Sequence, residues 1–242
     1  MDVMTWLDGS EELSQRLGRP VITLSYAQSL DGCLSLGDKQ PVALSGREAM
    51  RVTHQLRAAH DAILVGIETV LADDPQLNVR LVEGRNPQPV VLDTHLRIPD
   101  NCRLLTREKD LPWIAAGKQA DPKRCAELER LGARVLILES DVDERISLPE
   151  LLTRLYQMGI QRLMVEGGAR VISSFLGQQM VDRVVISVAP FYLGGLHVAE
   201  KRLAVRDAHE PQSVIAPTLI DPVYETMGRD LMVWGQLRKG KI

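Results

Sequence analysis

The sequence predicts an α/β fold whose mixed, mostly parallel sheet is flanked by helices and completed by a C-terminal antiparallel hairpin. Short, almost wholly apolar segments alternate with segments of helical length and period between residues 20 and 189. Apolar runs of this kind are typical of parallel strands that are covered on both faces. After Gly194-Gly195 the alternation gives way to two β-rich segments around Gly228-Arg229-Asp230, which predicts the hairpin.

The individual elements follow from the same patterns. Strands are predicted where β-branched or apolar runs are bounded by proline, glycine or charged residues, at 21–26, 61–66, 89–93, 112–117, 134–138, 162–165 and 182–189, with the hairpin at 219–234. Helices are predicted between them, at 46–59, 121–131, 148–158 and 168–178.

Two further expectations concern the chain's organisation. Ser45 and Glu48 have the spacing of a capping box, in which each side chain bonds a free backbone N–H at the helix start. No linker, internal repeat or low-complexity tract divides the chain. We therefore expect an N-terminal leader at 1–19, able to form a short helix, and a single domain at 20–242.

Composition excludes several classes of protein. Lys and Arg together number 29 and Asp and Glu 32, so a net charge of -3 gives no general field that would attract nucleic acid. The three cysteines are odd in number and widely spaced, which indicates neither a disulfide framework nor a zinc knuckle. Without a signal peptide or an apolar run of about 20 residues, the expectation is a soluble, cytoplasmic protein with no membrane partner.

Ligands of open α/β sheets bind beyond the carboxyl ends of the parallel strands, so the segments that follow strands are the first candidates for a site. Four such segments carry polar side chains or glycines, namely Ser29-Leu30-Asp31-Gly32, 69–80, Glu166-Gly167-Gly168 and 189–195. Arg57 and Arg80 suit a phosphate, because a guanidinium presents a rigid fork of donors. The paired glycines would let the backbone of a helix start approach an anion.

Each candidate also has a purely structural interpretation. The first segment fits a plain Asp-Gly turn, and Glu166-Gly167-Gly168 fits a structural turn. The segment 69–80 fits a short helix closed by Asp74-Pro75 and followed by an edge strand, and an arginine on a helix is often only a solvated side chain. Neither a dinucleotide fingerprint nor a P-loop is present, and the histidines and cysteines show no metal or nucleophile spacing.

Together, however, the four segments resemble one family, the pyrimidine reductases of riboflavin biosynthesis. The matching positions share their order and spacing with this family over roughly residues 20 to 236: Ser29-Leu30-Asp31-Gly32, Leu56-Arg57-Ala58, Asp61-Ala62-Ile63, Thr69 to Pro75, Arg80, Glu166-Gly167-Gly168, Ala189-Pro190 and Gly194-Gly195. The zinc signature of deaminases is missing. The chain thus resembles the stand-alone form of the reductase half of the bifunctional deaminase–reductase.

The resemblance implies a fold similar to dihydrofolate reductase and a homodimer. It implies NADPH-dependent reduction of a 6-ribosylamino-pyrimidinone 5′-phosphate, deaminated or not, to its ribitylamino form. Hydride would convert an imine at C1′ of the ring-opened sugar to an amine. No metal is expected.

The resemblance also implies roles for individual residues. The NADPH-binding residues would be Ala27, Thr69, Asp73, Gly167, Gly168, Ala169, Arg170, Ser173 and Ser174. The substrate-binding residues would be Ser29, Arg57, Leu77, Arg80 and Glu166. Asp31 and Glu166 are the candidates for a catalytic acid, although solvent could also supply the proton.

Three departures from the family pattern keep alternatives open. Glu68 stands where many relatives have glycine, 40–42 lacks a tryptophan that fused enzymes tend to have, and Ala169-Arg170 replaces further glycine and threonine. One alternative is a reductase of the same fold with another pterin-like or carbonyl substrate. The other is a nucleotide-binding module without catalytic activity.

Overall fold

The computed structural model describes residues 3–37, 42–140, 145–199, 203–207, 210 and 212–241. The strands of the main sheet are β1 (Val21–Ser29), β3 (Ala62–Gly66), β4 (Gln88–Leu92), β5 (Trp113–Gly117), β6 (Arg134–Leu138), β7 (Arg162–Val165), β8 (Arg183–Ala189), β10 (Val205–Arg206), β11 (Val214–Met227) and β12 (Asp230–Lys241). A separate small sheet pairs β2 (Cys33–Ser35) with β9 (Leu196–His197).

The helices differ in length from about one turn to almost four turns. They are η1 (Thr5–Leu7), α1 (Ser10–Leu17), α2 (Arg47–Ala59), α3 (Ile67–Asp73), α4 (Pro122–Arg130), α5 (Leu148–Gln157) and α6 (Ala169–Gly177). None of these described helices is long and apolar enough to cross a membrane.

Side chains cap two of the helices. Asp121 caps α4 by accepting the N–H of Lys123 at 3.0 Å, and Ser147 caps α5 through the N–H of Glu150 at 3.5 Å. Side-chain oxygens at these positions satisfy N–H groups that the helix itself leaves unpaired.

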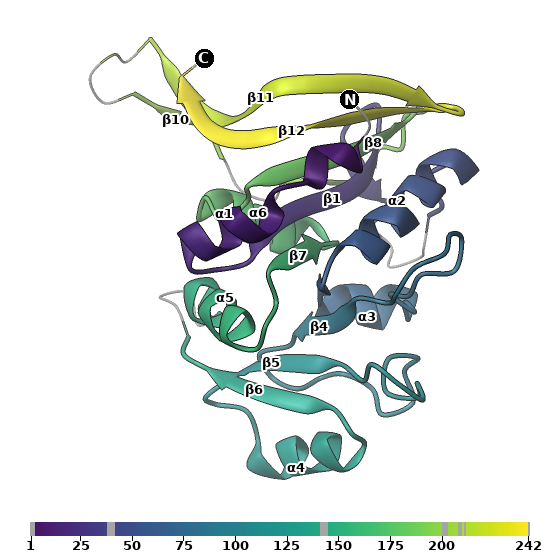
Figure 1. Ribbon diagram of the computed structural model, residues 1–242, viewed down its shortest axis with the longest axis vertical. Helices are drawn as coiled ribbons and strands as arrows, with labels where there is room; N and C mark the ends of the chain where they lie inside the picture. Colours follow the sequence, from purple (N-terminus) through teal and green to yellow (C-terminus); the bar gives the residue numbers. More distant parts are fainter. Residues whose placement is uncertain are drawn as a thin grey trace.

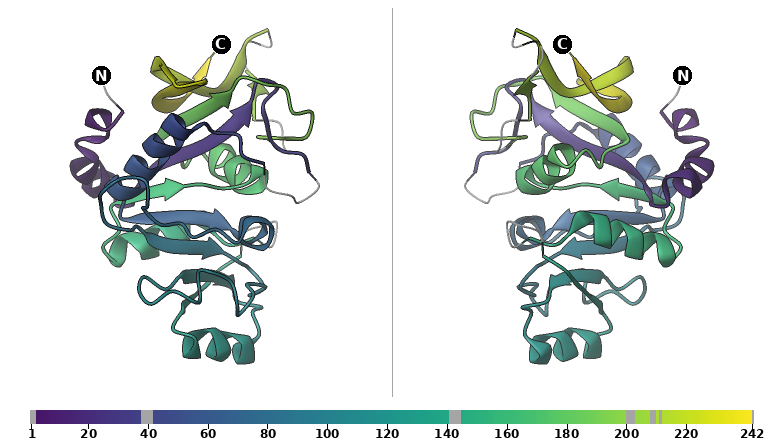
Figure 2. Two further views of the ribbon diagram at one scale, coloured as in Figure 1. Left: turned by 90° about the vertical axis from the view of Figure 1, so that its right-hand side faces the viewer. Right: turned by 90° about the vertical axis from the view of Figure 1, so that its left-hand side faces the viewer.

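The main sheet is mixed, as the sequence predicts (Figure 1). Its strand order is β10-β11-β12-β8-β1-β7-β3-β4-β5-β6, and every neighbouring pair from β8 to β6 is parallel. β12 is antiparallel to β8 and to β11, so a long hairpin forms one end of the sheet. The strands rotate along the sheet from this hairpin to β6 (Figure 2).

The central position of β7 comes from a return of the chain. After β1 the chain builds β3, β4, β5 and β6 in outward order, then comes back to place β7 between β1 and β3. β8 follows on the other side of β1. The order of the strands therefore reverses beside β7, and such a reversal is where open α/β sheets bind ligands.

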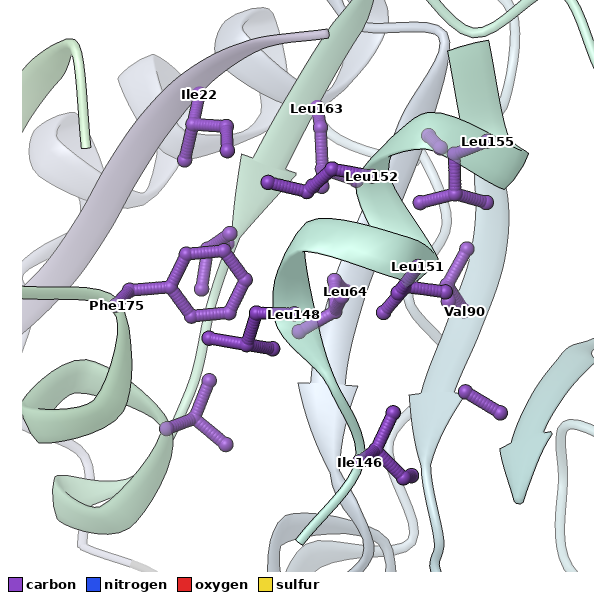
Figure 3. Packing of buried hydrophobic residues seen from close by; sticks show 14 of the residues in the cluster. Ile22, Leu64, Val90, Ile146, Leu148, Leu151, Leu152, Leu155, Leu163 and Phe175 are labelled. Carbon is purple, nitrogen blue, oxygen red and sulfur yellow. The ribbon is translucent and has the colours of Figure 1, made fainter. Parts of the chain in front are cut away.

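Alternation of side chains along the strands divides the core between the two faces. Ile22 and Leu24 of β1 and Leu64 of β3 pack with α5 and α6 on one face. The other face is covered by α2 together with the N-terminal segment, and by α3 and α4 farther along. The labelled leucines of α5 and Phe175 of α6 point toward the strands (Figure 3).

The N-terminal segment packs against the domain. Arg19 bonds Asp182 in bidentate fashion at 2.7 and 2.8 Å, and Asp182 also accepts the N–H of Ile22 at 2.8 Å. The buried guanidinium of Arg183 donates to the carbonyl oxygens of Leu7 and Asp8, at 3.0 and 3.2 Å. A cavity of about 350 Å³ lies beside these contacts, and Asp182 and Arg183 on its wall attach the N-terminal segment to the domain.

Most predicted elements are confirmed within one or two residues, with four differences. β1 extends to Ser29, and the hairpin strands reach well beyond 219–234. The expected capping box is wrong, because α2 begins after Gly46 and has no side-chain cap. Of the structural interpretation of 69–80, the short helix is confirmed as α3, but the edge strand before Arg80 is wrong, because Leu77 has a left-handed φ of 47° that interrupts an extended chain.

Asp61 joins the beginnings of β3 and β7. Its Oδ2 accepts the N–H groups of Gln161 and Arg162, at 3.1 and 2.9 Å, and its Oδ1 accepts from the guanidinium of Arg162 at 3.0 Å. Burial would raise the pKa of Asp61, but these donors outweigh burial and lower it. The ionised carboxylate therefore stabilises the fold.

Asp61→Asn is expected to lower the free energy of unfolding by about 1–3 kcal/mol at pH 7, since it removes bonds to a charged acceptor. The contribution of the carboxylate to the free energy of unfolding is fully present above its unfolded-state pKa of about 3.9. It is lost as the pH falls through the lower pKa of the folded state. Urea unfolding of both proteins from pH 7 to pH 3 measures the effect. A stability difference that stays constant below pH 4 would contradict this assignment.

Candidate active site

The candidate site lies at the carboxyl ends of β1, β3 and β7. These ends lead into the Ser29-to-Cys33 turn, into α3 and into the glycines before α6. β3 and β7 are directly paired, so α3 and the start of α6 lie side by side. A Cβ on Gly168 would lie 3.8 Å from Oγ1 of Thr69. The two segments expected to bind NADPH are thereby brought together.

A buried ion pair connects these strand ends to α2. Arg57 donates through Nε to Oε1 of Glu166 at 2.8 Å and through Nη2 to Oε2 at 2.7 Å, with side chains 9% and 18% exposed. Burial alone would lower the pKa of Arg57, but the Glu166 carboxylate outweighs it and raises that pKa. The parallel bidentate geometry fixes the orientation of both groups.

Arg57 also holds the segment that follows α3. Its Nη1 donates to the carbonyl oxygen of Asn78 at 3.1 Å. Leu77, next to Asn78, is 2% exposed and places its side chain in the core although its backbone is left-handed. Such a conformation is unfavourable for a branched apolar residue, so it persists because packing and hydrogen bonds impose it.

A cavity of about 300 Å³ opens between this segment and α2. Two of its arginines have carboxylate partners, since Arg57 pairs with Glu166 and Arg103 lies 3.5 Å from Asp74. The residues that line the cavity are Arg57, Asp73, Pro75, Gln76, Leu77, Arg80 and Arg103.

Arg80 differs from the other two arginines of the cavity. In the part of the chain that the structure describes, its guanidinium bonds only a neutral group, Oδ1 of Asn78 at 3.0 Å. A guanidinium carries five N–H donors, and one bond leaves most of them unused. Arg80 therefore keeps donors for an anion.

The start of α6 presents backbone N–H groups at the same edge of the sheet. Gly168 is the N-cap residue and provides no side-chain bond, so N–H groups of the first turn remain available. A Cβ on Gly167 would lie 2.4 Å from Cβ of Val171, and one on Gly66 would lie 2.8 Å from Cγ2 of Val171. Glycine is thus needed at both strand ends to let α6 approach the sheet.

Asp31 belongs to a different group of contacts. Its carboxylate accepts from the hydroxyl of Ser29 and from the N–H groups of Leu193 and Gly194, the latter two at 3.0 and 2.7 Å. These bonds lower the pKa of Asp31 below its usual range, the Ser29 bond contributing most. The carboxylate thus ties the end of β1 to the segment after β8, and its role in proton transfer stays a prediction.

Of the residues predicted to bind the cofactor, Asp73 alone lines the cavity, and no residue of 166–174 does so. Ala27 lies near the end of β1, where it pairs with β8. Arg170 is exposed in the first turn of α6, which begins at Ala169. Ser173 is 8% exposed, and the hydroxyl of Ser174 accepts from the guanidinium of Arg145 at 3.5 Å. Their contacts with a cofactor stay predictions.

Two other expectations concern metals and the substrate loop. Across the described ranges, no group of three or more His, Cys, Asp or Glu side chains could hold a metal ion. The segment 40–42, whose lack of a tryptophan keeps another substrate open, lies outside the described residues except for Val42.

Sequence analysis did not identify His54 or Arg103. His54 is fully buried and accepts the N–H of Arg80 at Nδ1, 3.1 Å away. A signal was available for His54, because it stands three residues before Arg57 and so lies on the same face of α2. Arg103 offered no such signal. Its contact with Asp74 joins segments that are distant in the chain, so spacing alone could not reveal it.

Comparison with known proteins finds a matching family and similar sequences. The family described as the RibD C-terminal domain matches residues 20–216. The 2,5-diamino-6-ribosylamino-4(3H)-pyrimidinone 5′-phosphate reductase of Methanothermobacter thermautotrophicus is 42% identical over 180 residues, which cover 73% of this chain and 81% of that protein.

Two solved structures are similar over most of the chain. The riboflavin biosynthesis reductase of Saccharomyces cerevisiae has a TM-score of 0.69 and 26% identity, with 91% of each chain covered. Acinetobacter baumannii RibD has a TM-score of 0.78 over 97% of this chain, and its 24% identity supports the fold alone. This chain spans 62% of that RibD chain.

Gly167→Ala is expected to lower the free energy of unfolding by about 1–3 kcal/mol, because the added methyl group would overlap Val171. Gly177→Ala, at the other end of α6, is the matched control, since nothing lies within 4 Å of its Cβ position. That control should be neutral or stabilise by up to about 1 kcal/mol through helix propensity. Urea unfolding measures both variants, and equal stabilities would contradict the close approach of α6.

Proposed function

This chain belongs to the RibD C-terminal domain family, and from that premise we propose that it reduces a 6-ribosylamino-pyrimidinone 5′-phosphate to the ribitylamino form, with NADPH as the reductant. The reaction adds hydride to C1′ of the ring-opened sugar and a proton to the attached nitrogen, which converts an imine to an amine. The proposal is supported by relatives named as reductases of this pyrimidinone phosphate. The single structural observation that carries it is the cavity with Arg80 beside the Arg57–Glu166 pair.

The start of α6 fits a nicotinamide dinucleotide. Its first-turn N–H groups have no side-chain cap, and the partial positive charge of a helix start favours a pyrophosphate. Thr69 and Asp73, on neighbouring α3, would contact the same ligand, and Arg170 would contact a 2′-phosphate, which would favour NADPH over NADH. When bound, the cofactor would supply the hydride.

Arg80 is the proposed ligand of the substrate's 5′-phosphate. Its guanidinium keeps donors for an anion, and a guanidinium binds phosphate oxygens through two parallel bonds. Leu77 lines the same cavity but keeps its side chain in the core, so it would shape the substrate site through its backbone. A phosphate held at one end and a ring held at the other would fix the sugar between them, so that C1′ is aligned for reaction.

Glu166 would orient the substrate without changing its own position. Both of its oxygens already accept from Arg57, and each has a further lone pair for ring amines or sugar hydroxyls. Asp31 is held as a carboxylate by three donors. We therefore propose that solvent provides the proton for the amine nitrogen, while Asp31 positions the loop after β8.

The proposed function is tested by the loss of NADPH absorbance with the deaminated and the undeaminated ribosylamino-pyrimidine phosphates in parallel. Oxidation of NADPH in step with the ribitylamino product, for at least one substrate, is the expected result. NADH in place of NADPH is the control for cofactor choice. Absence of turnover with both substrates, while NADPH still binds, would contradict the proposal in favour of a reductase of another substrate or a nucleotide-binding module.

Arg80→Ala is expected to lower kcat/KM for the phosphorylated substrate about 10- to 100-fold, the equivalent of about 1.5–3 kcal/mol for bonds to a charged group. The dephosphorylated analogue should lose less than about threefold, because it makes no use of this guanidinium. Steady-state kinetics with both compounds give the comparison. Equal losses would show that Arg80 does not bind the phosphate.

A further inference from the structure

We propose that His54 is a positioning residue, which holds Arg80 toward the cavity by accepting its backbone N–H. This inference rests on the proposed function only in taking Arg80 as the phosphate ligand. His54 lies on α2, one helix turn before Arg57, and does not line the cavity. Its effect on the substrate would therefore pass through Arg80.

The hydrogen bond defines the state of the imidazole. Nδ1 of His54 lies 3.1 Å from the backbone nitrogen of Arg80, which always carries its hydrogen. Nδ1 must consequently be the unprotonated acceptor, and in the neutral ring the hydrogen lies on Nε2. Nε2 is buried and has no hydrogen-bond partner among the described residues. A buried donor without a partner is uncommon. Among the described residues, the hydrogen bond from Arg80 is therefore the one that the His54 ring makes.

Two residues of α2 thus hold the segment 77–80 at two points. Arg57 donates to the carbonyl oxygen of Asn78, and His54 accepts from the N–H of Arg80. Asn78 in turn accepts the Arg80 guanidinium at Oδ1, 3.0 Å away. The backbone of Arg80 is therefore fixed relative to α2, and the bond to Asn78 favours one direction of the exposed guanidinium.

The charges around His54 keep it in the accepting form. Burial, and after it the cations Arg57 and Arg80, lower the pKa of His54 to about 4, while Glu166 opposes them. A protonated Nδ1 could not accept from Arg80. The contact is accordingly maintained throughout the neutral range of pH.

His60 at the end of α2 is a matched control. It is also buried, and burial likewise lowers its pKa to about 4. Its ring nitrogens, however, lie 2.6 Å from the carbonyl oxygen of Leu56 and 2.9 Å from Oγ1 of Thr23, so it bonds the helix to β1. A substitution of His60 changes the packing of α2 without removing a bond to the segment 77–80.

The test compares His54→Leu, which has no acceptor, with His54→Asn, whose Oδ1 stands as many bonds from Cα as Nδ1 does. His54→Leu should raise KM for the phosphorylated substrate about 10-fold, with kcat and KM for NADPH within about twofold of the original protein. His54→Asn should restore KM for the phosphorylated substrate to within about threefold of the value of the original protein. His60→Leu should lower the unfolding temperature without the rise in KM. A His54→Asn protein no better than His54→Leu, or a KM rise shared by His60→Leu, would overturn the inference.

A double-mutant cycle separates positioning from general stability. If His54 acts through Arg80, His54→Leu should change KM less than about twofold in an Arg80→Ala background. An undiminished effect of about 10-fold in that background would contradict the proposal.

Two measurements do not depend on turnover. Calorimetric titration with ribose 5-phosphate should give weaker binding to His54→Leu than to the original protein, and this holds even if the pyrimidines prove not to be substrates. Nitrogen NMR of the original protein should show an unprotonated Nδ1 in His54 and slow exchange of the Arg80 amide. A protonated Nδ1, or equal binding of ribose 5-phosphate, would reject the inference without deciding the proposed reaction.

Discussion

The site depends on the bidentate contact between Arg57 and Glu166. It joins α2 to the carboxyl end of β7, the strand beside which the order of the sheet reverses. A buried ion pair of this kind stabilises little relative to an apolar pair, but loss of one partner leaves an uncompensated charge. Its value here is geometric, because Arg57 has a donor left for Asn78 and Glu166 keeps lone pairs for a ligand at the strand ends.

Around this pair the site combines rigid and exposed groups. Leu77, Glu166 and Arg57 are held by packing or by charge, whereas Arg80 and Arg170 are exposed. Rigid groups are suited to aligning reacting atoms, and exposed guanidinium groups are suited to capturing anions from water. This division agrees with a small phosphorylated substrate and a phosphorylated cofactor, each of which carries its charge away from the reacting carbon.

Strands and helices whose formation depends on short-range patterns could be predicted from the sequence. The apolar runs of β3 and β7 and the amphipathic period of α5 indicate strands and a helix whatever lies beside them. The segment after α3 could not be derived in the same way. Its left-handed Leu77 depends on contacts with α2, and the bond between Arg57 and Glu166 spans more than a hundred positions. Arg80 was identified from the donors of its guanidinium and Glu166 from its place after a predicted strand, and the family's motifs then implied their roles. His54 required the folded arrangement.

Because the chain returns late to form β7, the middle of the sheet can be completed only late in synthesis. β1 and β3 do not touch each other in the finished sheet, because Arg162–Val165 lie between them. Until those residues have been synthesised, a nascent chain contains β1 alone and the group β3 to β6 with no strand to join them, and both leave edges open to mispairing. The edge proposed to bind ligands is therefore assembled only once β7 has left the ribosome, whatever order the outer strands adopt.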